Sequence, residues 1–231
     1  LAGCGKDTVA DLLTTMCGYH KIGFADALYN EVSLAFDIPV DQLRHRATKE
    51  HPLSTLALSR CLAPGFVGAL MLHHDKRAEK LDLHAPRSPR QILQWWGTEY
   101  RRAIDSNYWV GIVNRKIADL TRRHIATHFV INDCRFDNEA DMVRAFGGQM
   151  WQVTRPGVDP LPGAHASETT GAAFKPDVVI NNDKDIQHLQ SLVLGAWLMH
   201  ECGIDAHTLV RMGIAHVPMA CEEWARHIPA N

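Results

Sequence analysis

A glycine-rich turn followed by a lysine opens the sequence. The segment Gly3–Thr8 reads GCGKDT and leads into residues whose apolar positions have helical spacing. Glycines let consecutive backbone N–H groups point toward phosphate oxygens, because no Cβ atom blocks the approach. A helix that begins near Lys6 adds the positive end of its dipole, and the lysine brings a mobile cation to the β- and γ-phosphates of a nucleotide. The pattern predicts Lys6 as a catalytic residue and six ATP-binding residues: Gly3, Cys4, Gly5, Lys6, Asp7 and Thr8.

This turn departs from the phosphate-loop pattern G-x-x-x-x-G-K-[ST] in two ways. Gly5 and Lys6 fit the second glycine and the lysine, which places the first glycine one position before Leu1. We therefore expect an upstream segment that supplies this glycine and the first strand. Asp7 stands where Ser or Thr is usual, and its carboxylate is a candidate Mg²⁺ ligand, directly or through water. The alternative is an ordinary glycine-rich turn before a helix.

Further candidates follow two predicted strands. The strand His128–Asp133 ends in an aspartate that is a candidate Mg²⁺ ligand, and Arg135 comes two residues later; Gln149–Val153 is followed by Arg155. Ligands of open α/β sheets bind beyond the carboxyl ends of the strands. We therefore expect Arg135 and Arg155 to be catalytic residues that neutralise charge on a transferring phosphate. The alternatives that stay open are a helix-capping Asp133, an Arg135 paired with an acidic neighbour, and a surface Arg155.

The elements that must position these residues alternate between strands and helices. Short segments rich in β-branched or aromatic residues predict four strands: His20–Ala25, His128–Asp133, Gln149–Val153 and Asp177–Asn181. Helical spacing of apolar residues predicts helices over 9–16, 110–120 and 186–196. This alternation implies parallel pairing through right-handed crossovers, hence an α/β layered domain. We expect one domain over 1–231 with a helical flap inserted at about 39–89, where no convincing strand occurs.

Composition excludes several other classes of protein. The chain has 231 residues, of which 46% are apolar and 22% charged, with a formal net charge of −2, which gives no reason to expect nucleic acid as a partner. No apolar run approaches the roughly 20 residues that cross a bilayer, so no membrane partner is expected. The six cysteines form no C-x-x-C pair, which favours reduced thiols in a cytoplasmic protein.

Four blocks resemble, in sequence and in order, the deoxynucleoside monophosphate kinases of phages and bacteria. They are GKDTVADLL (Gly5–Leu13), ILQWWGTEYRR (Ile92–Arg102), VINDCRFDNEA (Val130–Ala140) and HASE (His165–Glu168). The resemblance implies a three-layer P-loop fold with a central parallel sheet. It implies phosphorylation of a deoxynucleoside monophosphate by ATP with Mg²⁺, in the cytoplasm of a bacterium or of a phage-infected host, and it allows a homodimer.

The acceptor nucleotide is expected to contact residues of these blocks and of the segment after the first strand. By the resemblance, Asp26 contacts the acceptor and takes part in catalysis, although Tyr29 stands where the family commonly has a lysine. The segment Ile92–Arg102 is expected to form a helix interrupted at Gly97, and Gln94 in this segment offers an amide suited to the edge of a base. The full set of substrate-binding candidates is Asp26, Arg90, Gln94, Thr98, Arg101, Arg102, His165 and Glu168. Asn182, by the resemblance, lies near the adenine of ATP.

Local structural roles remain open for several of these residues. Asp26 could cap a helix, Arg90 could lie at a solvated helix start, and Asn182 could form a turn before the last helix. The resemblance also leaves two other functions open. One is a kinase for phosphomevalonate or dephospho-coenzyme A, and the other is a regulatory module that binds ATP without phosphoryl transfer.

Overall fold

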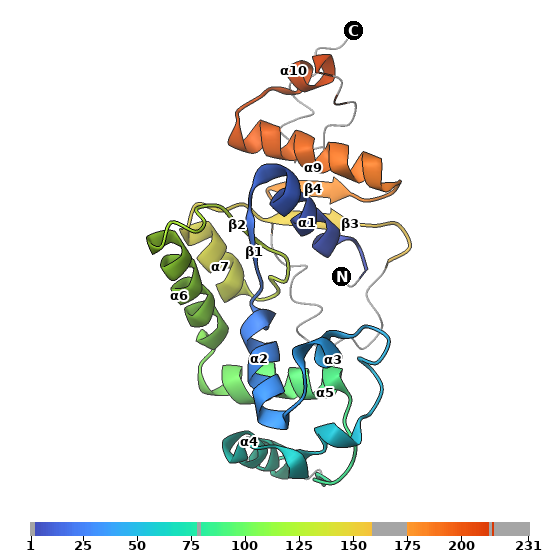
Figure 1. Ribbon diagram of the computed structural model, residues 1–231, viewed down its shortest axis with the longest axis vertical. Coiled ribbons are helices and arrows are strands. Elements are labelled where there is room, and N and C mark those ends of the chain that lie inside the picture. Colours follow the sequence, from blue (N-terminus) through green and yellow to red (C-terminus); the bar gives the residue numbers. More distant parts are fainter. Residues whose placement is uncertain (1–2, 78–79, 159–174, 213, 215–231) are drawn as a thin grey trace. The chain divides into compact units, whose positions relative to one another are not determined.

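The computed structural model describes residues 3–77, 80–158, 175–212 and 214. The chain divides into two compact units: one combines Leu1–Ile22 with Ile117–Asn231, and the other is Gly23–Lys116. We call them the mixed unit and the helical unit, because the four strands of the described residues all belong to the first (Figure 1). The helical flap expected at about 39–89 falls within the helical unit, and its bounds stay a prediction.

The strands of the mixed unit form two parallel pairs. β1 (His20–Ile22) pairs with β2 (Phe129–Ile131), and β3 (Trp151–Thr154) pairs with β4 (Val178–Asn181). All four predicted strands and their parallel direction are confirmed, although each strand is shorter than expected. β1 ends at Ile22 because the next residue donates its backbone N–H to the side chain of Asp26 and turns the chain into a helix. Within the described residues the two pairs stay separate sheets.

The helices of the mixed unit include the three predicted from spacing. Their bounds are α1 (Lys6–Cys17), α6 (Tyr108–Arg122), α7 (Asp137–Ala145), α9 (Ile186–Glu201) and α10 (Ala206–Arg211). α6 contains the sequence boundary between the units: residues 108–116 belong to the helical unit, and only residues 117–122 belong to the mixed unit. α1 ends where Gly18, at φ 73°, donates its N–H to the Leu13 carbonyl. α9 starts at Asp185, whose carboxylate accepts the N–H of His188.

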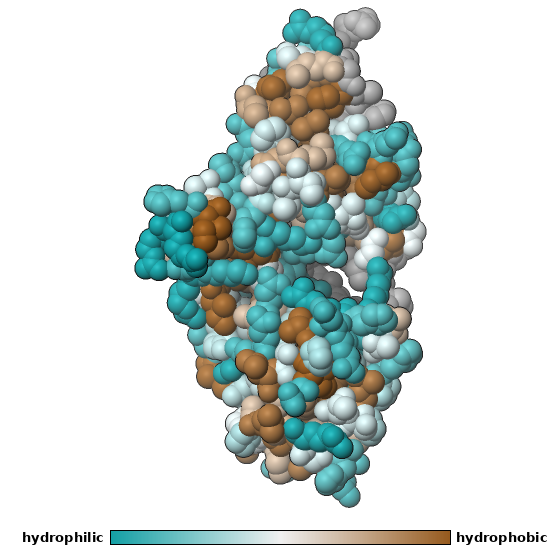
Figure 2. All heavy atoms as spheres, viewed as in Figure 1, coloured by the Kyte–Doolittle hydropathy of each residue, from teal (hydrophilic) through white to brown (hydrophobic). Residues whose placement is uncertain are grey.

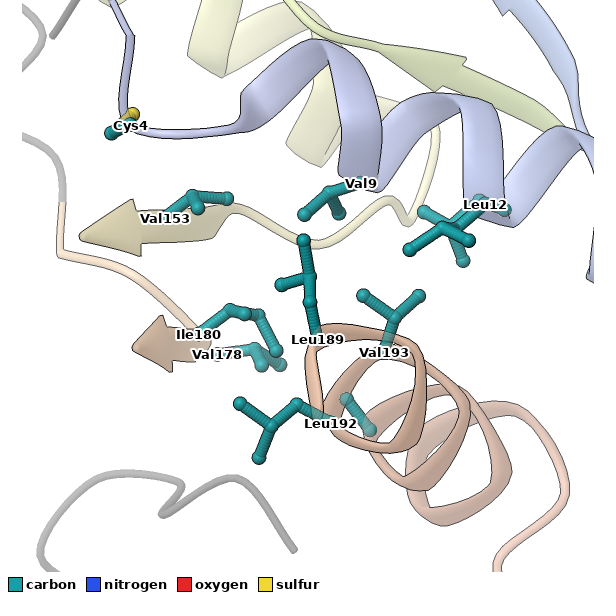
Figure 3. Close-up of a cluster of buried hydrophobic side chains, with 11 residues drawn as sticks. Cys4, Val9, Leu12, Val153, Val178, Ile180, Leu189, Leu192 and Val193 are labelled. Carbon is teal, nitrogen blue, oxygen red and sulfur yellow. The ribbon is translucent and has the colours of Figure 1, made fainter. Parts of the chain in front are cut away.

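One hydrophobic cluster joins α1, β3, β4 and α9. Figure 3 shows Val9 of α1, Val153 of β3, Ile180 of β4, and Leu189 and Val193 of α9 pointing toward one another. α1 also packs against β1 and β2. The helix that follows the glycine-rich turn therefore contacts both strand pairs, so the position of the turn is set by the core of the mixed unit.

The helical unit is built around aromatic side chains. Its elements are α2 (Ala25–Phe36), α3 (Val40–Arg44), the 3₁₀ turns η1 (Ser54–Leu56) and η2 (Leu58–Arg60), α4 (Pro64–Asp75), α5 (Pro89–Gln94) and η3 (Trp95–Arg102). Phe66 of α4 is fully buried, with its ring 4.5 Å from that of Trp96 and 5.6 Å from that of Tyr100. Trp96 is thus a core residue of this unit.

The expected interruption at Gly97 is wrong. α5 passes without a break into η3, a π-helix of eight residues that includes Gly97. The Gly97 carbonyl accepts a hydrogen bond from Trp109 Nε1 at 3.2 Å, a tertiary contact that supports the widened turn. π-Helical turns are rare and are often found at functional sites.

The surface and the helix lengths bear on possible partners. On the face seen in Figure 2 many side chains are hydrophilic, and apolar ones form a group over α9 and further groups over the helical unit. In the part of the chain that the structure describes, every helix is too short or too polar to span a membrane.

Candidate active site

The glycine-rich turn adopts a backbone conformation that favours glycine. Gly3 and Gly5 have φ values of 83° and 105°, both in the left-handed region. Gly5 directly precedes α1, and its carbonyl accepts the N–H of Val9 at 2.9 Å. Cys4 between the glycines is buried, and Thr8 lies in the first turn of the helix. The turn thus places a glycine backbone at the positive end of a 12-residue helix, an arrangement that suits an anionic ligand. We call residues 3–8 the phosphate loop.

Asn182, directly after β4, holds the phosphate loop. The residue is 9% exposed, and its Nδ2 donates to the Cys4 carbonyl at 3.0 Å. Its backbone N–H donates to the Thr154 carbonyl at the end of β3 at 2.8 Å. Gly5 has a φ of 105°, which strains any other residue, and a Cβ atom there would lie 2.5 Å from Asn182 Nδ2, so a larger residue would also displace this amide. The turn-forming alternative applies to its neighbour, since Asn181 Nδ2 donates to Asp183 Oδ2 at 3.2 Å.

Asp7 connects the phosphate loop to the other strand pair. Asn132, directly after β2, donates its side-chain N–H to Asp7 Oδ1. Lys6 Nζ lies 3.7 Å from Cys4 Sγ. The loop is therefore bonded to the carboxyl ends of β2 and β4, which is the edge where ligands of α/β sheets bind.

The donor set near the loop fits Mg²⁺ bound together with a nucleotide. Asp7 is exposed, and Asp133 is half-buried just after β2. The described residues contain no group of three His, Cys, Asp or Glu side chains that could hold a metal on their own. Mg²⁺ commonly uses one or two carboxylates and completes its shell with phosphate oxygens and water. One or two carboxylates beside a phosphate loop are sufficient for that mode of binding.

The two predicted catalytic arginines follow β2 and β3. Arg135 is exposed, and its backbone N–H donates to Glu139 Oε2 at 2.7 Å; Phe136 N–H donates to the same oxygen at 3.2 Å. Glu139 is 2% exposed and so fixes the path of the chain around Arg135. Arg155 is exposed directly after β3. The alternative of an acidic neighbour paired with the Arg135 side chain stays open, and the contacts of Glu139 with the backbone shape this loop.

Asp26 of the helical unit is surrounded by donors. Its carboxylate accepts from Arg44 Nη2 at 2.8 Å and from Gly23 N–H at 3.0 Å, and Lys116 Nζ lies 3.5 Å away. Burial alone would raise the pKa of Asp26, but the two hydrogen bonds and the two positive charges outweigh it and lower the pKa. Asp26 is therefore ionised at neutral pH and gathers two cations around it.

Positive charge is also present at Tyr29, the position where the resemblance implies a lysine. Lys49 Nζ donates to the Tyr29 hydroxyl at 2.7 Å. The Arg44 guanidinium carbon lies 4.6 Å from the centroid of the same ring. Two residues from elsewhere in the helical unit thus bring cations to this place in the fold.

Other predicted acceptor residues have partners within the helical unit. Arg90 forms an ion pair with Glu50, and Arg102 Nη1 donates to the Ser106 carbonyl at 3.2 Å. Two residues are half-buried on α5 and η3: Gln94 and Thr98. The remaining two lie outside the described residues: His165 and Glu168.

Sequence reasoning missed Glu31, the partner of Arg101. Glu31 of α2 accepts hydrogen bonds from Trp96, Arg101 and Tyr108. A signal was present in the sequence, because this acidic residue comes four residues before the apolar Ala35 and so shares its helix face. A carboxylate on the apolar face of a helix needs a buried donor, and the sequence alone does not say which one.

Comparison with known proteins gives the family. A family model described as deoxynucleotide monophosphate kinase matches residues 71–193, which is more than half of the chain. A protein of Acanthamoeba polyphaga mimivirus, named "Putative deoxynucleotide monophosphate kinase", is 30% identical over 201 residues, covering 83% of this chain and 90% of the viral protein. The chain belongs to the deoxynucleotide monophosphate kinase family. This confirms the predicted family and, with it, phosphoryl transfer to deoxynucleoside monophosphates as the activity.

The contact between Asn182 and the phosphate loop leads to a first prediction. Asn182→Asp keeps the shape of the side chain but replaces the N–H donor with an oxygen that repels the Cys4 carbonyl. Losing a buried hydrogen bond and leaving its acceptor unpaired costs about 1–3 kcal/mol. Isothermal titration should therefore show ATP binding weakened about tenfold. Asn181→Ala, which changes the exposed neighbour, is the matched control and should bind ATP as the unaltered protein does. Equal ATP affinity in Asn182→Asp would show that this bond does not shape the loop.

The lowered pKa of Asp26 leads to a second prediction. A carboxyl whose pKa is lower in the folded protein stabilises the fold above its unfolded pKa, near 3.9, and this stabilisation is lost as the pH falls through the folded value. Urea unfolding of the unaltered protein and of Asp26→Asn should give free energies that differ most near neutral pH and converge below about pH 4. Arg44→Gln should reduce this pH dependence, since it removes one donor. A difference that stays constant down to pH 3 would contradict the role of the ionised carboxylate.

Proposed function

We propose that this protein transfers a phosphoryl group from ATP to a deoxynucleoside monophosphate, with ATP bound at the phosphate loop. The observation that carries this proposal is the backbone conformation of the phosphate loop, together with the hydrogen bonds that hold it. Two left-handed glycines precede α1, and side chains after β2 and β4 bond to the loop residues. Family membership supports the acceptor class, and the loop geometry supports the donor.

We propose further that the mixed unit is part of a three-layer P-loop fold with one central sheet. Both strand pairs are parallel, and α1 packs against both of them. In such folds the phosphate-binding helix starts at the carboxyl edge of the sheet. The bonds from the ends of β2 and β4 to the loop support this arrangement.

The residues of the mixed unit take distinct roles in this proposal. The loop N–H groups and Lys6 bind the β- and γ-phosphates of ATP, and Arg135 and Arg155 neutralise charge on the group in transfer. Asp7 and Asp133 would hold Mg²⁺, which neutralises phosphate charge when bound. An acceptor phosphate oxygen is already anionic at neutral pH. Positioning and electrostatics therefore carry the catalysis, without a strong general base.

The residues of the helical unit are proposed to bind the acceptor. Asp26 is ionised and gathers Arg44 and Lys116, which gives this region the positive charge that a nucleotide phosphate needs. Arg90 and Arg102 already contact protein groups, so they would have to share those contacts with a substrate. A homodimer and a cytoplasmic location stay predictions from the sequence.

A panel assay tests the function. Purified protein is incubated with radiolabelled ATP, Mg²⁺ and, in turn, dAMP, dGMP, dCMP, dTMP, phosphomevalonate and dephospho-coenzyme A. We expect a labelled diphosphate from at least one deoxynucleotide and a loss of about 10²-fold or more in Lys6→Ala, because a preorganised cation at the transferring phosphate is removed. Lys21→Ala, which alters an ion pair with Asp11 on the same unit, should retain activity.

The same assay separates the rival functions. Turnover of phosphomevalonate or dephospho-coenzyme A alone would overturn the acceptor class. ATP binding without transfer to any of the six acceptors would identify a regulatory module.

A further inference from the structure

A single carboxylate in the helical unit collects three donors from two other elements. Glu31 Oε2 accepts from Trp96 Nε1 at 2.7 Å and from Arg101 Nε at 2.8 Å, and Oε1 accepts from the Tyr108 hydroxyl at 2.5 Å. The side chain of Glu31 is 21% exposed and that of Arg101 is 26% exposed. A partly buried ion pair of this kind is weak evidence for stabilisation, since desolvation offsets much of the attraction. The arrangement of the hydrogen bonds around this ion pair says more about its function than its contribution to stability does.

The hydrogen bonds leave the end of the arginine accessible. Glu31 binds Arg101 through Nε, and the described part of the chain gives the two terminal nitrogens of Arg101 no hydrogen bond. Three aromatic rings lie around the guanidinium, with its central carbon 4.6 Å from the ring centroid of Tyr108, 4.8 Å from that of Tyr100 and 5.8 Å from that of Trp96. A planar guanidinium held in this way presents two parallel N–H donors, which match the oxygens of a phosphate.

The π-helix explains how Trp96 and Arg101 reach the same carboxylate. They are five residues apart, and in an α-helix residues at that spacing point about 140° away from each other. In a π-helix the hydrogen-bonded pairs are themselves five residues apart, so such residues share a face. The widened turn of η3 therefore places both donors on the side of Glu31.

The Glu31 carboxylate bonds to Nε of Arg101, which leaves the two terminal nitrogens of Arg101 as the accessible end. Two neutral donors, the Trp96 indole and the Tyr108 hydroxyl, take up part of the carboxylate's hydrogen-bonding capacity. Burial, together with the hydrogen bond to Glu31 and the negative charge of that carboxylate, raises the pKa of Tyr108 to about 12, so its hydroxyl remains a donor at neutral pH. Glu31 thus orients the Arg101 guanidinium through Nε, and the terminal N–H groups of Arg101 are the donors that would bind an anion.

We propose that Glu31 is a positioning residue that fixes Arg101 to bind the phosphate monoester of the acceptor nucleotide. The proposal rests on the proposed function, because it assigns the acceptor phosphate to the helical unit. It adds a residue outside the four blocks that carry the family resemblance, and it gives the π-helix a function.

Steady-state kinetics and direct binding test the role of Glu31. In Glu31→Gln the carboxylate charge is lost with little change of shape, so Arg101 is held less firmly. We expect the KM for the preferred deoxynucleoside monophosphate to rise about tenfold, as for the loss of a hydrogen bond to a charged group. The KM for ATP should be unchanged, and titration of that monophosphate in the absence of ATP should show the same tenfold loss. Asn30→Ala, the exposed neighbour on α2, is the matched control and should leave both values unchanged.

A double-mutant cycle tests whether Glu31 acts through Arg101. Arg101→Gln should weaken binding of the monophosphate at least as much as Glu31→Gln, and the double variant should bind it no worse than Arg101→Gln alone. Additive effects, or a lower melting temperature of Glu31→Gln with unchanged affinity for the monophosphate, would overturn the proposal.

The outcome for the unaltered protein separates this proposal from the proposed function. Transfer to a deoxynucleotide together with unchanged kinetics in Glu31→Gln would overturn the positioning role alone. If the unaltered protein bound none of the four monophosphates, both proposals would fail.

Discussion

The hydrogen bond from the Asn182 side chain to the Cys4 carbonyl fixes the backbone on which the proposed chemistry depends. It ties the phosphate loop to the end of β4, and the backbone N–H of the same residue bonds to the end of β3. The left-handed φ of Gly5 and the close approach of the amide together favour glycine at that position. A loop held in this way has its N–H groups oriented before a ligand arrives, which lowers the entropic cost of binding.

Each unit uses a polar group, partly or fully buried, to position an element that we propose binds phosphate, but with different chemistry. In the mixed unit a neutral amide donates to a carbonyl, which orients backbone N–H groups without adding charge next to a polyphosphate. In the helical unit the Glu31 carboxylate orients the Arg101 guanidinium, so a negative charge lies next to the positive charge that it positions. The second solution works because the Glu31 carboxylate faces Nε and is also bonded to two neutral donors. The hydrogen bonds of Asn182 and of Glu31 explain why these polar side chains are tolerated in packed surroundings.

The sequence predicts the parts of the structure that depend on local patterns. The four strands, their parallel direction, and the helices α1, α6 and α9 follow from apolar spacing and short β-branched runs. The phosphate loop follows from its glycines and lysine. Gly97 misled the prediction because glycine usually interrupts a helix, whereas its carbonyl is bound here by Trp109.

The missed contacts depend on residues that are distant in sequence. The donors to Glu31 are 65, 70 and 77 residues away, and Asn182 lies 178 residues from Cys4. Asn181-Asn182-Asp183 has the composition of a turn, and only the fold shows that one of these side chains is buried against the loop. Pairing of this kind is decided by the tertiary structure, which no local pattern encodes.

The most direct test of the central claim is a nuclear magnetic resonance titration of ¹⁵N-labelled protein with ATP and Mg²⁺, in which the backbone amide signals of the phosphate loop are followed. If the loop N–H groups bind the phosphates, the amide signals of Gly5, Lys6, Asp7 and Thr8 should shift most, and tripolyphosphate should reproduce those shifts without the nucleoside. Saturable ATP binding that leaves these four signals unchanged while others move would contradict the account.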